Sequence, residues 1–164
     1  MTFHVSVQAG ASRRRHWLVA ASCALLLRPG LAAGMQQALP SSVSLSDELR
    51  DAWRHSRPLV VMVSLEGCVF CRYVRQHLVP LREQGEASIV QVDMRSQRLT
   101  RDFSGRPVSH DDRVRAWNIK VAPTVLFIGR GGAEIAEKLS GYSDDFYGFY
   151  LAERLASAQA RLHV

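Results

Sequence analysis

The feature that most constrains the fold is a run of five apolar residues, Leu59 to Val63, in a chain of 164 residues. Valine fills three of these positions, and β-branched side chains favour strands. A strand that is apolar on both faces is typical of a central strand that is buried on both faces of the sheet. The turn Glu66-Gly67 follows, and residues 68–82 then show a helical period in which Pro80 predicts a kink or an early end. The run therefore predicts an α/β fold.

The remaining segments fit a sheet with helices on both faces. Ser44 and Asp47 have the spacing of a capping box at the start of a helix that Pro58 ends. Residues 88–93 predict a second buried strand, which we expect to be parallel to the first because only a helix links the two. The other predictions are a loop or insertion over 94–110, a short helix over 111–117, a hairpin of strands 124–128 and 134–139, and a last helix capped by Ser143–Asp145.

The first 34 residues have the pattern of a secretory signal peptide. Arg13–Arg15 precede an apolar run of about twelve residues, and the small residues Ala32–Gly34 that follow are typical of a signal-peptide cleavage site. The run is shorter than the roughly 20 residues that a membrane-spanning helix needs, although an uncleaved anchor is an alternative. We predict a signal peptide over 1–33, a linker over 34–44 and one domain over 45–162. The mature chain is expected in a bacterial periplasm, without stable insertion into the membrane.

The positive charge of the chain belongs largely to this leader. The formal net charge is +6, but residues 1–34 hold four arginines and no acidic residue. The remaining residues carry seventeen basic and fifteen acidic side chains. So small an excess does not indicate a polyanionic partner, and no nucleic-acid binding is predicted.

Removal of the leader leaves two cysteines, Cys68 and Cys71, at the junction of the apolar strand and the following helix. The N-terminus of a helix favours a thiolate at the first cysteine, and the second lies one turn along, where it can resolve a mixed disulfide. A zinc site would need a second ligand pair. A structural disulfide would add little stability across so short a loop, and a copper carrier would normally place Met before the pair. The spacing favours redox chemistry without a metal or another cofactor.

The cysteine pair, Val121-Ala122-Pro123-Thr124 before a strand, the glycine-containing hairpin and Gly141-Tyr142 together resemble the thioredoxin family over about residues 45–162. More narrowly, the chain is similar to exported thioredoxin-like proteins encoded with bacterial sulfur-oxidation systems, and to the thioredoxin-like domain of periplasmic electron-transfer reductases. The resemblance implies a thioredoxin fold with a mixed central sheet. It implies that Cys68 attacks, that Cys71 resolves, and that Pro123 is a cis-proline facing the pair.

The resemblance also implies substrate contacts, and the chain departs from the family pattern near them. The backbone of Ala122 would pair with the substrate chain, and Val69 and Phe70 would contact it beside the cysteines. Many thioredoxins carry a buried acid where this chain has Met62. The usual Trp before the first cysteine and Gly-Pro between the cysteines are absent, and Glu66 would raise the pKa of the Cys68 thiol. These departures favour a reductase or isomerase role over that of a strong oxidant. The missing acid argues against an efficient general reductase and favours a restricted set of partners.

Three aromatic positions and one histidine complete the candidate list. Phe70, Trp117 and Tyr142 are candidates for an apolar rim around the cysteines, although Trp117 suits the core equally well. His77 is interpreted as an ordinary residue of its helix.

The sequence leads to a principal hypothesis and two alternatives. The first is a monomeric periplasmic thiol–disulfide oxidoreductase, a reductase of protein disulfides supplied by a membrane electron donor. The second is a non-enzymatic binding or regulatory subunit of a sulfur-oxidation or cytochrome-maturation system. A glutaredoxin-like enzyme ranks below both because Ala122-Pro123-Thr124 replaces that family's Thr-Val-Pro.

Overall fold

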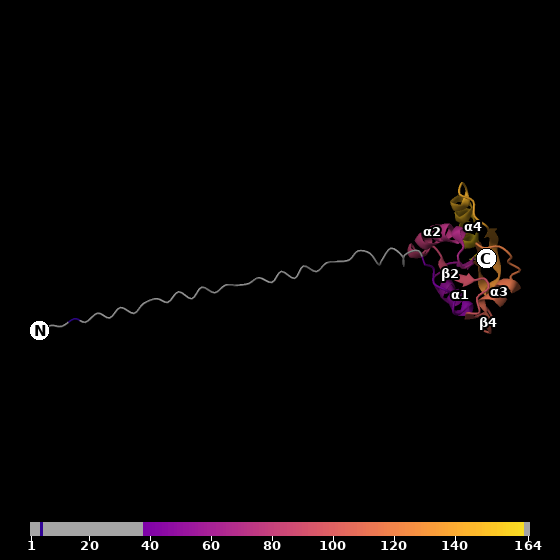
Figure 1. The fold of residues 1–164 in the computed structure, drawn as a ribbon, viewed down its shortest axis with the longest axis horizontal. Coiled ribbons are helices and arrows are strands. Elements are labelled where there is room, and N and C mark those ends of the chain that lie inside the picture. The colour runs from indigo at the N-terminus through magenta and orange to yellow at the C-terminus, as the bar shows by residue number, and fades with distance from the viewer. Residues whose placement is uncertain (1–3, 5–37, 163–164) are drawn as a thin grey trace.

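The computed structural model describes His4 and residues 38–162, so the predicted signal peptide lies outside the described residues except at His4. Helices and strands alternate through most of the described chain (Figure 1). In order, the elements are α1 (Leu45–Arg54), β1 (Leu59–Ser64), α2 (Val69–Glu83), β2 (Ser88–Asp93), β3 (Leu99–Arg101), β4 (Pro107–Ser109), α3 (His110–Ala116), β5 (Thr124–Ile128), the 3₁₀ turn η1 (Arg130–Gly132), β6 (Glu134–Ser140) and α4 (Tyr147–Arg161).

The central sheet is mixed, as the sequence predicts. Its strand order is β2-β1-β5-β6. Strands β1 and β2 are parallel, while β5 runs antiparallel to both β1 and β6. All six residues of β1 are buried, which matches its lack of a polar face. The predicted fold class is confirmed.

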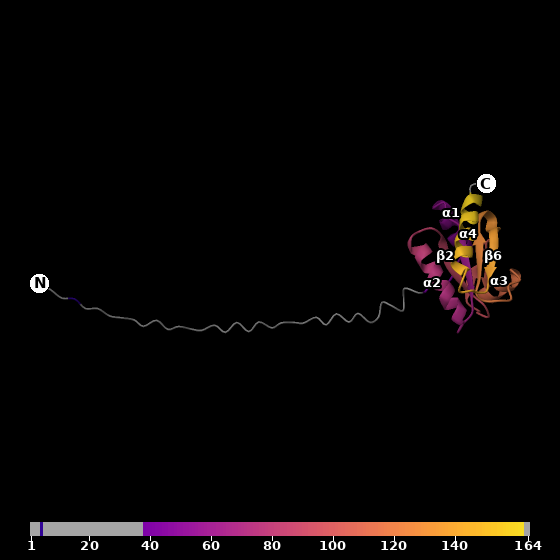
Figure 2. The same ribbon diagram turned by 90° about the horizontal axis from the view of Figure 1, so that it is seen from above.

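Helices cover both faces of this sheet. Alternate residues of β1 point to opposite faces because side chains alternate along a strand. Val60 and Met62 pack with α2 and α4, whereas Leu59, Val61 and Val63 pack on the face that α1 and α3 cover. Figure 1 shows α2 and α4 on one side of the sheet with α1 and α3 on the other, and Figure 2 looks onto the α2 and α4 side.

Three local predictions differ from the structure. The expected loop over 94–110 contains an antiparallel hairpin, β3–β4. Helix α2 continues through Pro80 to Glu83, and α4 begins at Tyr147 without a side-chain cap. The expected capping segment is used differently, because the carboxylate of Asp144 accepts a hydrogen bond from the hydroxyl of Tyr142 (2.7 Å).

The carboxylate of Asp102 holds the turn between β3 and β4. It accepts hydrogen bonds from the hydroxyl and the backbone N–H of Ser104, and from the backbone N–H of Arg106. The hydrogen bond from the Ser104 side chain is the main cause that lowers the pKa of Asp102 to about 2, and the burial of Asp102 opposes it. These local bonds give residues 102–106 a defined turn that the hydrophobic pattern alone does not indicate.

The segment expected to be a linker packs on the domain from Leu39 onward. Leu39 is buried in the core on the α2 and α4 side. The backbone N–H of Ser42 donates to the carbonyl of Gln91 (2.8 Å), so this segment continues the sheet beyond β2. Across the residues that the structure describes, no helix has the length and apolar content needed to span a membrane.

Candidate redox-active site

A short turn between β1 and α2 presents the two cysteines. The backbone N–H of Cys68 donates to the carbonyl of Leu65 (3.2 Å), which closes the turn. Gly67 has a φ of +72° there, a conformation that side-chain-bearing residues rarely adopt. The sharp reversal places Cys68 at the N-cap of α2, directly beyond the buried end of β1.

The position of Cys68 at the start of a 15-residue helix favours negative charge on its sulfur. The backbone N–H of Cys71 donates to Sγ of Cys68 (3.1 Å), using one of the N–H groups that a helix leaves unpaired at its start. The two cysteines form a disulfide with their Cα atoms 5.3 Å apart. In the reduced protein, the same donor and the helix dipole would stabilise a thiolate at Cys68.

The two sulfurs differ in accessibility. Cys71 is fully buried in the core cluster that contains Met62 and Val74. Cys68 is only partly buried and packs at the edge of this cluster. Cys68 is therefore the sulfur that a partner can reach, and Met62 lies buried where many thioredoxins place an acid.

The structure brings Ala122 and Pro123 to the same end of the sheet. Thr124 pairs with Val63, so the residues before β5 lie beside the end of β1 that leads to Cys68. The Ala122–Pro123 peptide bond is cis, and the carbonyl of Pro123 accepts a hydrogen bond from Gly141 (2.8 Å). Ala122 packs against the core cluster that Cys68 also contacts.

Rings in stacked and tilted contact occupy one side of the disulfide and form what we term the aromatic flank. The centroid of the Tyr142 ring lies 6.1 Å from that of Phe70, 5.3 Å from that of Tyr73 and 5.2 Å from that of Tyr147. Phe70 is 56% exposed, and Val69 beside it is also exposed. The aromatic flank consists of Phe70, Tyr73, His77, Tyr142 and Tyr147.

At this flank, the structure supports the core alternative for Trp117 and differs from the interpretation of His77 as an ordinary helix residue. Trp117 is not part of it, because its ring packs with Phe103 and under the guanidinium of Arg113 on the opposite face of the sheet. His77 joins it, with its ring centroid 5.5 Å from that of Tyr147. The sequence could have indicated this placement of His77, because Phe70, Tyr73 and His77 are spaced three and four residues apart and so lie on one face of the helix.

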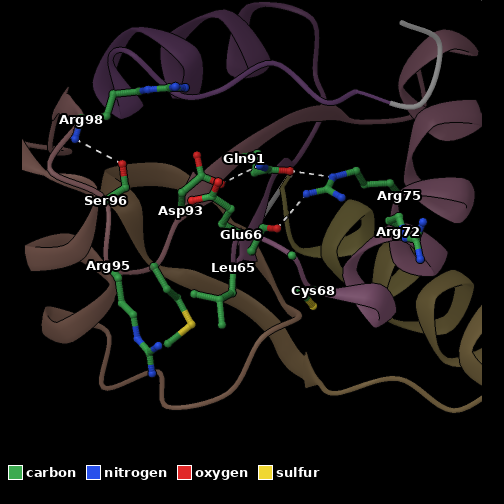
Figure 3. Close-up of a pocket in the computed structure, with 13 residues that line it drawn as sticks. Leu65, Glu66, Cys68, Arg72, Arg75, Gln91, Asp93, Arg95, Ser96 and Arg98 are labelled. Carbon is green, nitrogen blue, oxygen red and sulfur yellow. Dashed lines mark hydrogen bonds between the residues drawn. The ribbon is translucent and has the colours of Figure 1, made fainter. Parts of the chain in front are cut away.

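A cavity of about 1190 Å³ opens on another side of Cys68. Figure 3 shows Arg72 and Arg75 of α2 at one side of it, Arg95 and Arg98 of the loop after β2 at the opposite side, and two carboxylates between them. We term this region the arginine cavity and define it by Arg72, Arg75, Arg95 and Arg98, together with Glu66 and Asp93.

A chain of hydrogen bonds fixes Arg75 at the base of the arginine cavity. Its guanidinium donates to Oε1 of Gln91 (2.9 Å) and to the hydroxyl of Ser64 (2.8 Å), and Nε2 of Gln91 donates to Asp93 (2.6 Å). Burial lowers the pKa of Arg75, and the charge of Asp93 partly offsets that effect. Burial opposes ionisation of Asp93, but contacts with His110 and Gln91 outweigh it and keep the pKa of Asp93 below its usual value.

His110, which no sequence motif singled out, supports this region from behind. It is fully buried. Its Nδ1 accepts the backbone N–H of Asp93 (3.1 Å), and its Nε2 lies 2.9 Å from the carbonyl of Ser42. This pairing assigns the proton to Nε2, so His110 ties the N-terminal segment to the end of β2.

The profile of the thioredoxin-like domain family matches residues 45–149. The chain belongs to this family. Its fold is similar to that of a thioredoxin-fold protein from Helicobacter pylori, with 17% sequence identity, a TM-score of 0.52, and coverage of 79% of this chain and 92% of that one. It is also similar to a poplar thioredoxin h mutant, with 18% identity, a TM-score of 0.51, and coverage of 74% and 84%. The chain matches no curated protein at a significant level.

Proposed function

We propose that the protein is a thiol–disulfide oxidoreductase that reduces protein disulfides through Cys68 and Cys71. One observation carries this proposal: within a thioredoxin-like domain, the accessible Cys68 caps a helix and is paired with the buried Cys71. Helix-terminal cysteines with a neighbouring resolving cysteine have the properties that thiol–disulfide exchange requires.

The reaction transfers two electrons from the reduced pair to the substrate disulfide. The thiolate of Cys68 attacks one substrate sulfur, forms a mixed disulfide and releases the other substrate sulfur as a thiolate. Cys71, after losing its proton, attacks Sγ of Cys68 and releases the first substrate sulfur as a second thiolate. The protein is left with the Cys68–Cys71 disulfide, and the substrate is left as a dithiol after protonation.

The surroundings of the pair support a role in holding an extended substrate. In this proposal the backbone of Ala122, next to the cis-bonded Pro123, pairs with the substrate chain, and the exposed Val69 and Phe70 pack against it. The signal-like leader supports a periplasmic location, where a membrane electron donor would reduce the pair again.

Trapping of mixed disulfides tests the proposed function. A Cys71→Ala variant, secreted with its own leader, is expected to accumulate mixed disulfides that disappear on treatment with a reductant. The matched Cys68→Ala variant should trap none, because it lacks the accessible sulfur. Failure of Cys71→Ala to trap any protein, together with failure of the reduced wild type to cleave a peptide disulfide, would reject the proposal.

One observation supports a non-enzymatic alternative. Met62 is buried in the core cluster that contains Cys71, at the position where many thioredoxins carry a carboxylate that would accept the proton of the resolving thiol. A binding or regulatory subunit of a sulfur-oxidation or cytochrome-maturation system would not need that proton acceptor. Full function of a Cys68→Ser, Cys71→Ser strain would support this alternative, whereas loss of function in that strain would exclude it.

A further inference from the structure

The arginine cavity gathers positive charge beside the reactive sulfur, and we propose that it binds an acidic segment of the protein whose disulfide is reduced. This inference rests on the proposed function and names the kind of substrate. Cys68 lines the same cavity as all four arginines. An acidic segment bound there would hold a neighbouring disulfide close to Sγ of Cys68, which raises the rate of attack by proximity.

Within the described part of the chain, none of the four cavity arginines lies within ion-pair distance of a carboxylate, although Asp93 acts on Arg75 and Arg98 from farther away. Among the residues that the structure describes, the arginines paired with carboxylates are Arg50, Arg106, Arg115 and Arg154. All four lie outside the cavity. The four cavity arginines face two carboxylates, Glu66 and Asp93, so the lining carries an excess of positive charge. An anionic ligand would supply the missing partners.

Arg75 gives this charge a fixed position. Ser64 and Gln91, the two side chains to which Arg75 donates, are neutral, and Ser64 is fully buried. Asp93 already accepts a hydrogen bond from Gln91. A guanidinium has five N–H donors, so Arg75 keeps donors for a ligand after these two bonds. Its planar fork is suited to a carboxylate.

The shape of the cavity favours a polypeptide over a small anion. Figure 3 shows the side chains of Arg72 and Arg75 across the cavity from those of Arg95 and Arg98, without convergence on one point. The volume of about 1190 Å³ is above the roughly 300–1,000 Å³ typical of small-molecule pockets. A small anionic disulfide would contact the arginines on one side of the cavity only, whereas an extended segment with several carboxylates can contact the arginines on both sides.

Binding and kinetics with paired peptides test the inference. The probes are an acidic peptide without cysteine, and two peptide disulfides that differ only in Glu or Gln residues around the cysteines. The cavity variant carries Arg72→Gln, Arg95→Gln and Arg98→Gln. The control variant removes the same charge at three exposed arginines outside the cavity, through Arg54→Gln, Arg82→Gln and Arg130→Gln.

We expect the oxidised wild type to bind the cysteine-free acidic peptide, measured by fluorescence anisotropy. The cavity variant should bind it about tenfold more weakly, while the control variant retains most of the affinity. The ratio of kcat/KM for the acidic over the neutral disulfide should fall by the same factor in the cavity variant. Raising the salt concentration should lower this ratio in the wild type.

Several results would overturn the inference. Absence of binding to the acidic peptide would do so, as would equal losses in the two triple variants, which would indicate net charge alone. Arginine-dependent preference for glutathione disulfide, with no preference for the acidic peptide disulfide, would assign the cavity to small anionic disulfides. Arginine-dependent binding of the acidic peptide with no reduction of any disulfide would uphold the binding site and reject the proposed function.

Discussion

The two flanks of the disulfide are built from different kinds of interaction. The aromatic flank consists of rings in mutual contact from α2, the turn after β6 and the start of α4. The arginine cavity consists of separated charges from α2 and from the loop after β2. Ring contacts act only at van der Waals range, whereas charges act over about 10 Å at 0.1 M salt. The disulfide therefore lies between one surface whose interactions act only at contact range and another whose charges act over a longer range.

The bases of the two flanks also differ. Arg75, at the base of the arginine cavity, donates hydrogen bonds to both Ser64 and Gln91. Tyr147, at the base of the aromatic flank, is buried, and its hydroxyl has no hydrogen-bond partner in the described part of the chain. Hydrogen bonds therefore stabilise the base of the arginine cavity, whereas the buried Tyr147 hydroxyl destabilises the base of the aromatic flank. The following substitutions test this contrast.

The largest effect on folding is expected from Arg75→Met. This change keeps the apolar stem but leaves the fully buried Ser64 hydroxyl and the Gln91 amide without a donor, so the free energy of unfolding should fall by about 1–3 kcal/mol. Arg72→Met, on the same helix and exposed, should change it by less than about 0.5 kcal/mol. Denaturant unfolding measures both. Equal losses would show that Arg75 is no better fixed than its exposed neighbour.

The next effect concerns the aromatic flank. Tyr142→Ala removes the ring that contacts Phe70, Tyr73 and Tyr147, and should lower kcat/KM for a neutral peptide disulfide by about tenfold. The same factor is expected at low and at high salt, because no charge is removed. Tyr142→Phe, which keeps the ring but loses the hydrogen bond to Asp144, should retain most of the activity. A factor that changes with salt would contradict the separation of the two flanks.

The central sheet was predictable because its signals are local. The apolar run from Leu59 to Val63 indicated a strand buried on both faces, and the structure confirms it. The β3–β4 hairpin was missed because its strands have three residues each, too few to show a period, and one begins with Pro107. A sequence clue existed in Asp102, whose spacing to Ser104 and Gly105 is typical of a side-chain-stabilised turn.

The two flanks were harder to predict because each joins residues that are distant in sequence. Phe70 and Tyr142 were named together, but no pattern indicated that Tyr147 would contact Tyr142, and the sequence left Trp117 open between the rim and the core. The arginine cavity was missed because most of the net charge was assigned to the leader, so the arginines of the mature domain were not considered as a group. The carboxyl ends of parallel strands meet at one edge of a sheet, so the residues after β1 and after β2 had to be neighbours. That rule could have brought the α2 arginines together with Arg95 and Arg98.

The smallest effect is expected at the base of the aromatic flank. Burial raises the pKa of the Tyr147 hydroxyl, so that group stays neutral, and it is desolvated without a partner in the described part of the chain. Tyr147→Phe keeps the ring and should raise the free energy of unfolding by up to about 1 kcal/mol. The exposed Tyr150→Phe is the control and should have almost no effect. A loss of stability in Tyr147→Phe, measured by thermal unfolding, would mean that the hydroxyl is satisfied after all, and the contrast with the fully bonded Arg75 would then disappear.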